Sequence, residues 1–262
     1  MEDYIKYNKQ SWNDKVEPHF NSEFYDVNGF LNGESSLNDI ELKLLGDVCG
    51  KSILHLQCHF GLDSLSLARM GAKVTAVDFS ENAIEKANEL KEKTGLDVDF
   101  ICSNVLDLKE HLMGQFDIVY VTYGTIGWLS DLDKWASIVS YFLKPSGKLV
   151  FVEFHPVIWM FDDDIDKISY SYFRDEAIEE EYEGTYADRD AGIKQKTISW
   201  NQGIGEVAQS LKKNGVAIDD LQEYDFSPYA CFRNLRKDGE RVYRFSHIKP
   251  IPMVYSIVGV KK

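Results

Sequence analysis

The chain has 262 residues, the size of one large α/β domain, and its 44% hydrophobic and 27% charged residues exclude fibrous and fully disordered classes. No apolar run approaches the roughly 18 to 20 residues of a membrane span, and the first ten residues do not form a signal-peptide pattern, so we expect a cytoplasmic protein without a membrane partner. The formal net charge of −14 opposes binding to nucleic acid.

Short β-rich runs alternate along the chain with stretches of helical period, as is typical of a parallel sheet flanked by helices. The predicted strands are residues 52–57, 73–78, 98–103, 117–123, 148–154, 217–226 and 252–260. The predicted helices are residues 62–70, 81–94, 132–143 and 205–215, with Ser80 as an N-cap and Gly95 as a stop signal. We therefore predict an α/β fold of three α/β/α layers. Its Rossmann-like, doubly wound, seven-stranded sheet is mostly parallel, with an antiparallel last strand.

We predict one domain that carries an insertion. Residues 1–45 form a helical cap or lid, residues 46–160 and 203–262 form the Rossmann-like core, and residues 161–202 form an acidic, aromatic insertion over the active site. Residues 161–190 contain twelve acidic and three basic side chains together with six aromatic ones. This composition favours either a neutral or cationic small-molecule ligand, or simply a solvated acidic face.

The ends of the first two predicted strands hold the main candidates for a binding site, because ligands bind beyond the carboxyl ends of an open parallel sheet. The first strand leads through a turn into a helix whose free N–H groups can meet an anionic group. Asp78 ends the next strand 21 residues after Gln57, about the spacing at which an acid accepts ribose hydroxyls. An adenosine-containing ligand fits both features.

From about Lys51 to Lys262 the chain resembles the class I S-adenosylmethionine-dependent methyltransferases. The resemblance rests on the strand, turn and helix at 53–68, VDFS at 77–80, the strand ending at 102–104, FDIVYVTYG at 116–124 and LKPSGKLVFVE at 143–153. LHLQCHFGLDSLSLARMGA and His155-Pro156 are similar to a bacterial branch that acts on small molecules. The resemblance implies in-line methyl transfer from S-adenosyl-L-methionine to a small-molecule acceptor, with S-adenosyl-L-homocysteine as product.

The resemblance also implies which residues bind the cofactor. Gln57, Cys58, His59 and Gly61 would form the turn under its methionine part, Asp78 would hold the ribose, and Phe79, Ser80, Ser103, Asn104 and Val105 would surround the adenine. Tyr123 and Gly124 would face the sulfonium, and Trp12 adds an aromatic face for a cationic donor. Gln57 and His59 stand where the family usually has glycine. Their side chains must therefore point away from the cofactor or touch its carboxylate.

The catalytic candidates lie just past the fourth and fifth strands. Glu153 is predicted to orient the substrate and His155 to act as a base, and Tyr123, which would face the sulfonium, is the third candidate. His155-Pro156 is equally consistent with a simple turn. Methyl transfer depends mainly on alignment and exclusion of water, so the absence of a base motif does not oppose this function. No spacing typical of metal ligands occurs, and we predict no required metal.

Two other functions compete with methyl transfer. A catalytically silent protein that binds S-adenosylmethionine or a nucleotide is compatible with the altered first turn. An NAD(P)-dependent oxidoreductase shares the fold, but the chain lacks GxGxxG and has no tyrosine followed four residues later by lysine. A nucleic-acid methyltransferase is opposed by the charge and by Thr122-Tyr123-Gly124-Thr125 in place of an Asn/Asp-Pro-Pro-Tyr box. The sequence leaves monomer and homodimer open.

Overall fold

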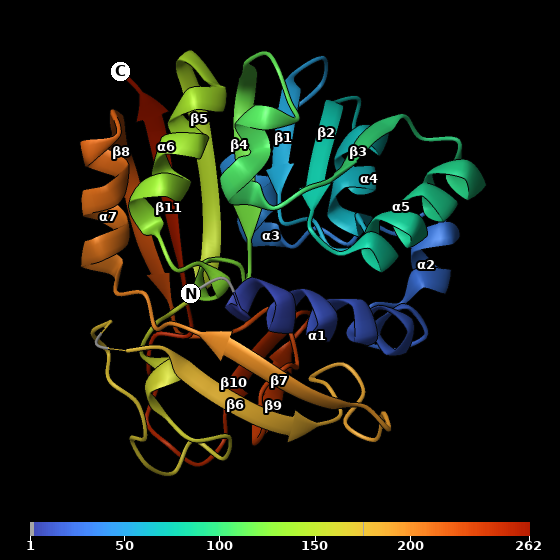
Figure 1. Cartoon of the computed structure of the whole chain (residues 1–262). Helices are drawn as coiled ribbons and strands as arrows, with labels where there is room; N and C mark the ends of the chain where they lie inside the picture. Colours follow the sequence, from blue (N-terminus) through green and yellow to red (C-terminus); the bar gives the residue numbers. More distant parts are fainter. Residues whose placement is uncertain (1–2, 175) are drawn as a thin grey trace.

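A seven-stranded sheet forms the centre of the computed structural model, which describes residues 3–174 and 176–262 (Figure 1). The strands lie in the order β3-β2-β1-β4-β5-β11-β8. Their bounds are β1 Ser52–Leu56, β2 Lys73–Asp78, β3 Val98–Cys102, β4 Phe116–Thr122, β5 Leu143–Phe154, β8 Val216–Tyr224 and β11 Val254–Lys261. Pairing is parallel from β3 to β5, whereas β11 is antiparallel to both β5 and β8. The predicted Rossmann-like sheet and its antiparallel last strand are confirmed.

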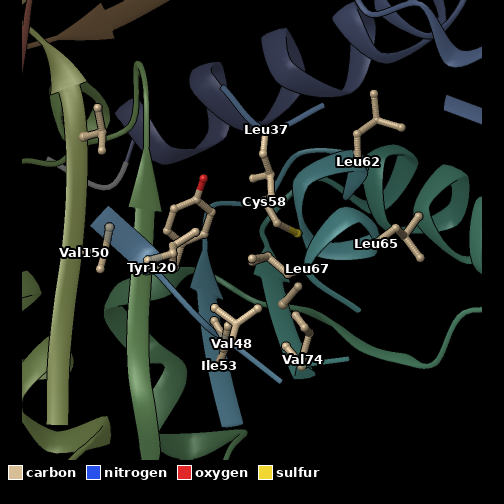
Figure 2. Packing of buried hydrophobic residues seen from close by; sticks show 14 of the residues in the cluster. Leu37, Val48, Ile53, Cys58, Leu62, Leu65, Leu67, Val74, Tyr120 and Val150 are labelled. Carbon is tan, nitrogen blue, oxygen red and sulfur yellow. The ribbon is translucent and has the colours of Figure 1, made fainter. Parts of the chain in front are cut away.

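Helices cover both faces of this sheet. One face carries α3 (Asp39–Leu45), α4 (Leu62–Arg69) and α5 (Glu81–Thr94), with α2 (Val27–Leu31) beside them; the other carries η1 (Val105–Glu110), α6 (Leu132–Phe142) and α7 (Ile204–Lys213). Successive strand residues serve opposite faces, as the period of two requires, so Ile53 packs on the α4 side and Leu54 on the α6 side. Figure 2 shows part of the first face, where Ile53, Leu67 and Val74 lie together.

The residues predicted to begin and end the helix at 81–94, Ser80 and Gly95, do so in the structure. The Ser80 hydroxyl accepts the Ala83 N–H at 3.1 Å, and Gly95 ends α5 with a φ of 67°, which favours glycine. The carboxylate of Asp131 caps α6 in the same way, through the N–H of Lys134 at 2.9 Å. Across the described residues, no helix combines the length and the apolar character that crossing a bilayer requires.

The N-terminal helix α1 (Asp3–Phe20) lies across the end of the sheet at which β1, β2 and β4 finish (Figure 1). A hairpin of β6 (Ile178–Glu183) and β7 (Lys194–Ser199) packs against α1, and a second hairpin joins β9 (Leu235–Gly239) to β10 (Val242–Phe245). The Asn8 side chain donates to the Ile198 carbonyl at 2.7 Å and accepts the Ile198 N–H at 2.9 Å. Helix α1 is therefore held between the core and the insertion. The short helices η2 (Ile126–Trp128) and η3 (Ile158–Met160) follow β4 and β5.

The acidic side chains of β6 lie mainly on its exposed face. Glu179, Glu181 and Glu183 are exposed, and lysines of the neighbouring strand pair with two of them: Lys194 with Glu183 at 2.8 Å and Lys196 with Glu179 at 3.1 Å. This arrangement matches the second of the two interpretations of the acidic composition, a solvated face. The charge of β6 is therefore no guide to the ligand.

Candidate functional site

The turn that follows β1 keeps a glycine-like backbone although two of its positions carry side chains. Gln57 and His59 have φ values of 57° and 50°, and Gly61 has 76°. A residue other than glycine costs roughly 1 to 2 kcal/mol in this left-handed region. Backbone bonds hold the turn in place: Cys58 N–H donates to the Val77 carbonyl at 2.9 Å, and His59 N–H donates to Asp78 Oδ2 at 2.8 Å. The backbone path of a glycine-rich turn is thus retained.

Gly61 is the one glycine of this turn that close packing also requires. A Cβ added there would lie 2.5 Å from Cε1 of Phe100, in addition to the strain of a positive φ. We expect Gly61→Ala to lower the free energy of unfolding by about 3 kcal/mol, as measured in urea. Gly95→Ala is the matched control, because it has a φ of 67° and nothing within 4 Å of the added Cβ. It should lose only about 1 kcal/mol, and equal losses in the two variants would contradict the packing argument.

A cavity of about 110 Å³ lies beyond the ends of β1, β2, β3 and β4. Most of the predicted cofactor residues line it: Trp12, Gln57, His59, Asp78, Phe79, Ser103, Asn104, Val105, Tyr123 and Gly124. Cys58, Gly61 and Ser80 lie behind this wall. Cys58 is buried, Gly61 caps α4, and the Ser80 hydroxyl bonds to Asn13 Oδ1 at 2.6 Å. Residues from four strand ends are therefore brought to one place.

Asp78 presents a buried carboxylate at this wall. Its Oδ2 accepts the His59 N–H at 2.8 Å, and its Oδ1 accepts the Ser80 N–H at 2.9 Å. Burial raises the pKa of Asp78 to about 6, and the backbone hydrogen bonds oppose that rise. The group is mainly ionised at neutral pH, and each oxygen keeps a lone pair that can accept from a ligand hydroxyl.

Two side chains of the turn, those of Gln57 and His59, each have one polar atom without a hydrogen-bond partner among the described residues. Gln57 Nε2 donates to the Thr125 carbonyl at 2.9 Å, but the buried Gln57 Oε1 has no partner in the part of the chain that the structure describes. His59 Nε2 lies 3.0 Å from His19 Nδ1, and the buried His59 Nδ1 has no partner within the same part of the chain. Burial lowers the pKa of His59 to about 3 and that of His19 to about 2, so both rings are neutral at physiological pH. A ligand in the cavity can satisfy these atoms.

Glu153 lies behind the cavity and organises the turn after β4. Its carboxylate accepts the backbone N–H groups of Gly124, Thr125 and Ile126, those of Thr125 and Ile126 at 2.7 and 3.2 Å, and also the Thr125 hydroxyl at 3.0 Å. Burial raises the pKa of Glu153 and these bonds oppose the rise. Glu153 does not line the cavity, although the turn that it holds does.

His155 also lies away from the cavity wall. Its Nδ1 accepts the Val157 N–H at 3.1 Å, and its Nε2 lies 2.8 Å from Glu223 Oε1 on β8. Burial lowers the pKa of His155 and Glu223 opposes the decrease. Both ring nitrogens therefore have protein partners, and the structure does not bring His155 together with Tyr123 and Asp78.

Tyr123 lines the cavity and leads to an acid that the sequence analysis missed. It has a φ of 23°, and its hydroxyl donates to Glu41 Oε2 at 3.0 Å. Glu41 is fully buried on α3, where Asn38 Nδ2 donates to its other oxygen at 2.9 Å. Burial and then the charge of Asp63 raise the pKa of Glu41 to about 7. The spacing of Asn38 and Glu41 in the sequence is typical of a capping box, which indicates the start of a helix but not a functional site.

Aromatic side chains from distant segments cover the cavity. Tyr25 follows α1 and Tyr186 follows β6, and their hydroxyl oxygens lie 2.5 Å apart. The ring of Trp12 on α1 packs edge-on against Trp128, with centroids 5.6 Å apart. Tyr186 was not predicted as a site residue. Apart from Trp12, the buried face of α1 was missed too, although Asn8, Trp12, Lys15 and His19 follow a helical period.

Comparisons with known proteins agree with this geometry. Residues 53–147 match the family model described as a methyltransferase domain. A ubiquinone biosynthesis O-methyltransferase from Xanthomonas euvesicatoria is 30% identical over 129 residues, which cover 48% of this chain and 54% of that protein. The chain thus spans about half the length of the curated relatives that it matches.

Two solved structures share the fold over nearly their whole length. An S-adenosylmethionine-dependent methyltransferase from Mesorhizobium loti aligns with a TM-score of 0.59 and 18% identity, covering 88% of this chain and all of the other. One from Clostridium acetobutylicum aligns with a TM-score of 0.59 and 15% identity, covering 97% and 98%. Residues 53–147 thus match a methyltransferase domain, and the chain shares its fold with solved S-adenosylmethionine-dependent methyltransferases, in agreement with the sequence resemblance.

Proposed function

We propose that the protein transfers a methyl group from S-adenosylmethionine to a small-molecule acceptor. The observation that carries the proposal is the convergence of Asp78, Asn104 and the turn at 57–61 on one cavity at the switch point between β1 and β4. The name of the Xanthomonas relative, an O-methyltransferase of ubiquinone biosynthesis, supports a small-molecule acceptor.

The residues around the cavity fit this cofactor. Asp78 is proposed to accept the ribose hydroxyls, and the unpartnered Gln57 Oε1 and His59 Nδ1 are available to polar atoms of the ligand. The rings of Trp12, Tyr123 and Trp128 line the same cavity, and aromatic faces attract a sulfonium. S-adenosylmethionine supplies an electrophilic methyl group when bound.

The protein's own contribution is proposed to be alignment and exclusion of water. Glu153 would act as a positioning residue, because it fixes the turn at 124–126 that faces the cavity. The predicted role of His155 as a base requires its link to Glu223 to open. Tyr123, whose hydroxyl reaches Glu41, remains the proposed residue beside the reacting centre.

Binding calorimetry tests the proposal. S-adenosylhomocysteine and S-adenosylmethionine should each give saturable heat, and NADH should give none. Transfer of labelled methyl groups to a panel of small molecules then separates an enzyme from a silent binding protein. No heat from either adenosyl compound, together with a clear NADH titration, would overturn the proposal in favour of the oxidoreductase.

The small size of the cavity supports the proposal that the segments covering it, α1 and the turn bearing Tyr186, act as a lid. Ligand pockets typically measure about 300 to 1,000 Å³, whereas this cavity measures about 110 Å³. We propose that α1 and the turn bearing Tyr186 move outward to admit the cofactor and then close over it.

Limited proteolysis provides a direct measurement of this movement. Cleavage near the exposed Glu17 on α1 should slow when S-adenosylhomocysteine is added, because the closed cover holds the helix. Cleavage in the exposed hairpin of β9 and β10 is the internal control and should keep its rate. Equal cleavage near Glu17 with and without the ligand would argue against a lid.

A further inference from the structure

Lys15 is a cationic residue of α1 whose side chain is buried. The residue is 2% exposed, and its Nζ lies 4.5 Å from the ring centroid of Trp12, 5.3 Å from that of Trp128 and 5.6 Å from that of Tyr182. Within residues 3–174 and 176–262, no hydrogen bond or ion pair joins the Lys15 ammonium to another group. The three rings form an aromatic cage around an ammonium that pairs with no acid of the described residues.

This cage does not fully compensate the charge. Removing an ammonium from water is unfavourable unless an anion or several acceptors replace the water, and ring faces offset only part of that loss. Burial lowers the pKa of Lys15 to about 7, and no carboxylate opposes the decrease. The neighbouring His19 and His59 are neutral and offer no negative charge. An anion that reaches Lys15 would therefore bind favourably and keep the ammonium protonated.

The position of the cage connects it to the proposed cofactor site. Trp12 and Trp128 line the cavity, and Lys15 contacts both rings without lining the cavity itself, while Tyr182 belongs to β6 of the insertion. We propose that Lys15 binds the carboxylate of a ligand held in this cavity. This inference rests on the proposed function, and the carboxylate has two sources: the amino-acid part of the cofactor or the acceptor molecule.

Calorimetry on three proteins at pH 7 tests the inference. The wild type is compared with Lys15→Met, which keeps the apolar stem, and with Lys6→Met as a control, because Lys6 is exposed on the same helix. The ligands are S-adenosylhomocysteine and 5′-methylthioadenosine, which lacks the amino-acid part. Benzoate is then titrated into protein saturated with S-adenosylhomocysteine, as a simple carboxylate probe. Lys15→Gln takes the place of Lys15→Met if the latter does not fold.

Each result either supports or overturns the inference. If the carboxylate belongs to the cofactor, Lys15→Met should bind S-adenosylhomocysteine about 10- to 100-fold more weakly and 5′-methylthioadenosine unchanged. If it belongs to the acceptor, both adenosyl affinities stay unchanged and benzoate binding is lost only in Lys15→Met. Unchanged binding of all three ligands overturns the role of Lys15. Failure of the wild type to bind S-adenosylhomocysteine would instead overturn the proposed function, which keeps the two failures distinct.

Discussion

Replacing Asp78 with asparagine will weaken the affinity for S-adenosylhomocysteine by about 10- to 100-fold. The variant loses the charge that would strengthen hydrogen bonds from ribose hydroxyls, and its amide N–H group would oppose one of the two backbone N–H groups that Asp78 accepts. The wild-type affinity should also fall below about pH 6, where Asp78 becomes protonated. Calorimetry over pH 5 to 8 measures both effects.

Asp99→Asn is the matched control for this measurement. Asp99 lies on β3 opposite Thr75 of β2, but it is exposed and away from the cavity. It should bind with the wild-type affinity, and circular dichroism should show that both variants are folded. An unchanged affinity in Asp78→Asn would contradict the proposed contact with the ribose.

Replacing Glu41 with glutamine will flatten the dependence of stability on pH. Burial raises the pKa of Glu41 from 4.5 to about 7, so the folded protein binds a proton more tightly than the unfolded chain does. The resulting stabilisation is complete below about pH 4.5 and is lost as the pH rises through 7. A shift of this size corresponds to about 3 kcal/mol. The amide of glutamine can still bond to Tyr123, so the variant keeps the contact without the charge.

Urea unfolding at pH 5, 6, 7 and 8 gives the required comparison. The free energy of unfolding of the wild type should decrease relative to that of Glu41→Gln by up to about 3 kcal/mol between pH 5 and 8. Using the difference between the two proteins removes the effects of buried acids that do not interact with Glu41, such as Asp78. The exposed Glu92→Gln should follow the wild type at every pH. Parallel profiles for the wild type and Glu41→Gln would show that Glu41 does not titrate in this range.

The sheet could be predicted because its strands are visible in the sequence as short apolar runs. Each predicted core strand appears in the structure within two residues, except that β5 begins at Leu143 and not at 148, and Ser80 and Gly95 mark the ends of α5 as expected. The β6–β7 hairpin could not be predicted in the same way. Its first strand has the sequence IEEEYE, in which the run of glutamates obscures the alternation of apolar and polar residues that is typical of a strand. The pairing of this strand with β7 depends on contacts that local sequence does not encode.

The candidate site was predicted only in part, for a related reason. Asp78 and Asn104 were found because strand ends are fixed by the sheet. Lys15 and Glu41 were missed, and Tyr186 was assigned only to the aromatic insertion over the site, because their surroundings come from elements that meet only in three dimensions. Glu153 is an intermediate case: its place after the fifth strand was evident, but its bonds to the turn at 124–126 depend on the register of β4 and β5.

The paired bonds between Asn8 and Ile198 have a consequence for engineering. They tie Asn8 on α1 to β7, 190 positions away, so the part that covers the cavity is discontinuous in sequence. A chimaera that exchanges only the segment around β6 and β7 with that of another methyltransferase would leave Asn8 and its neighbours facing a foreign strand. Exchanging the segment that packs on α1 therefore requires moving both segments together.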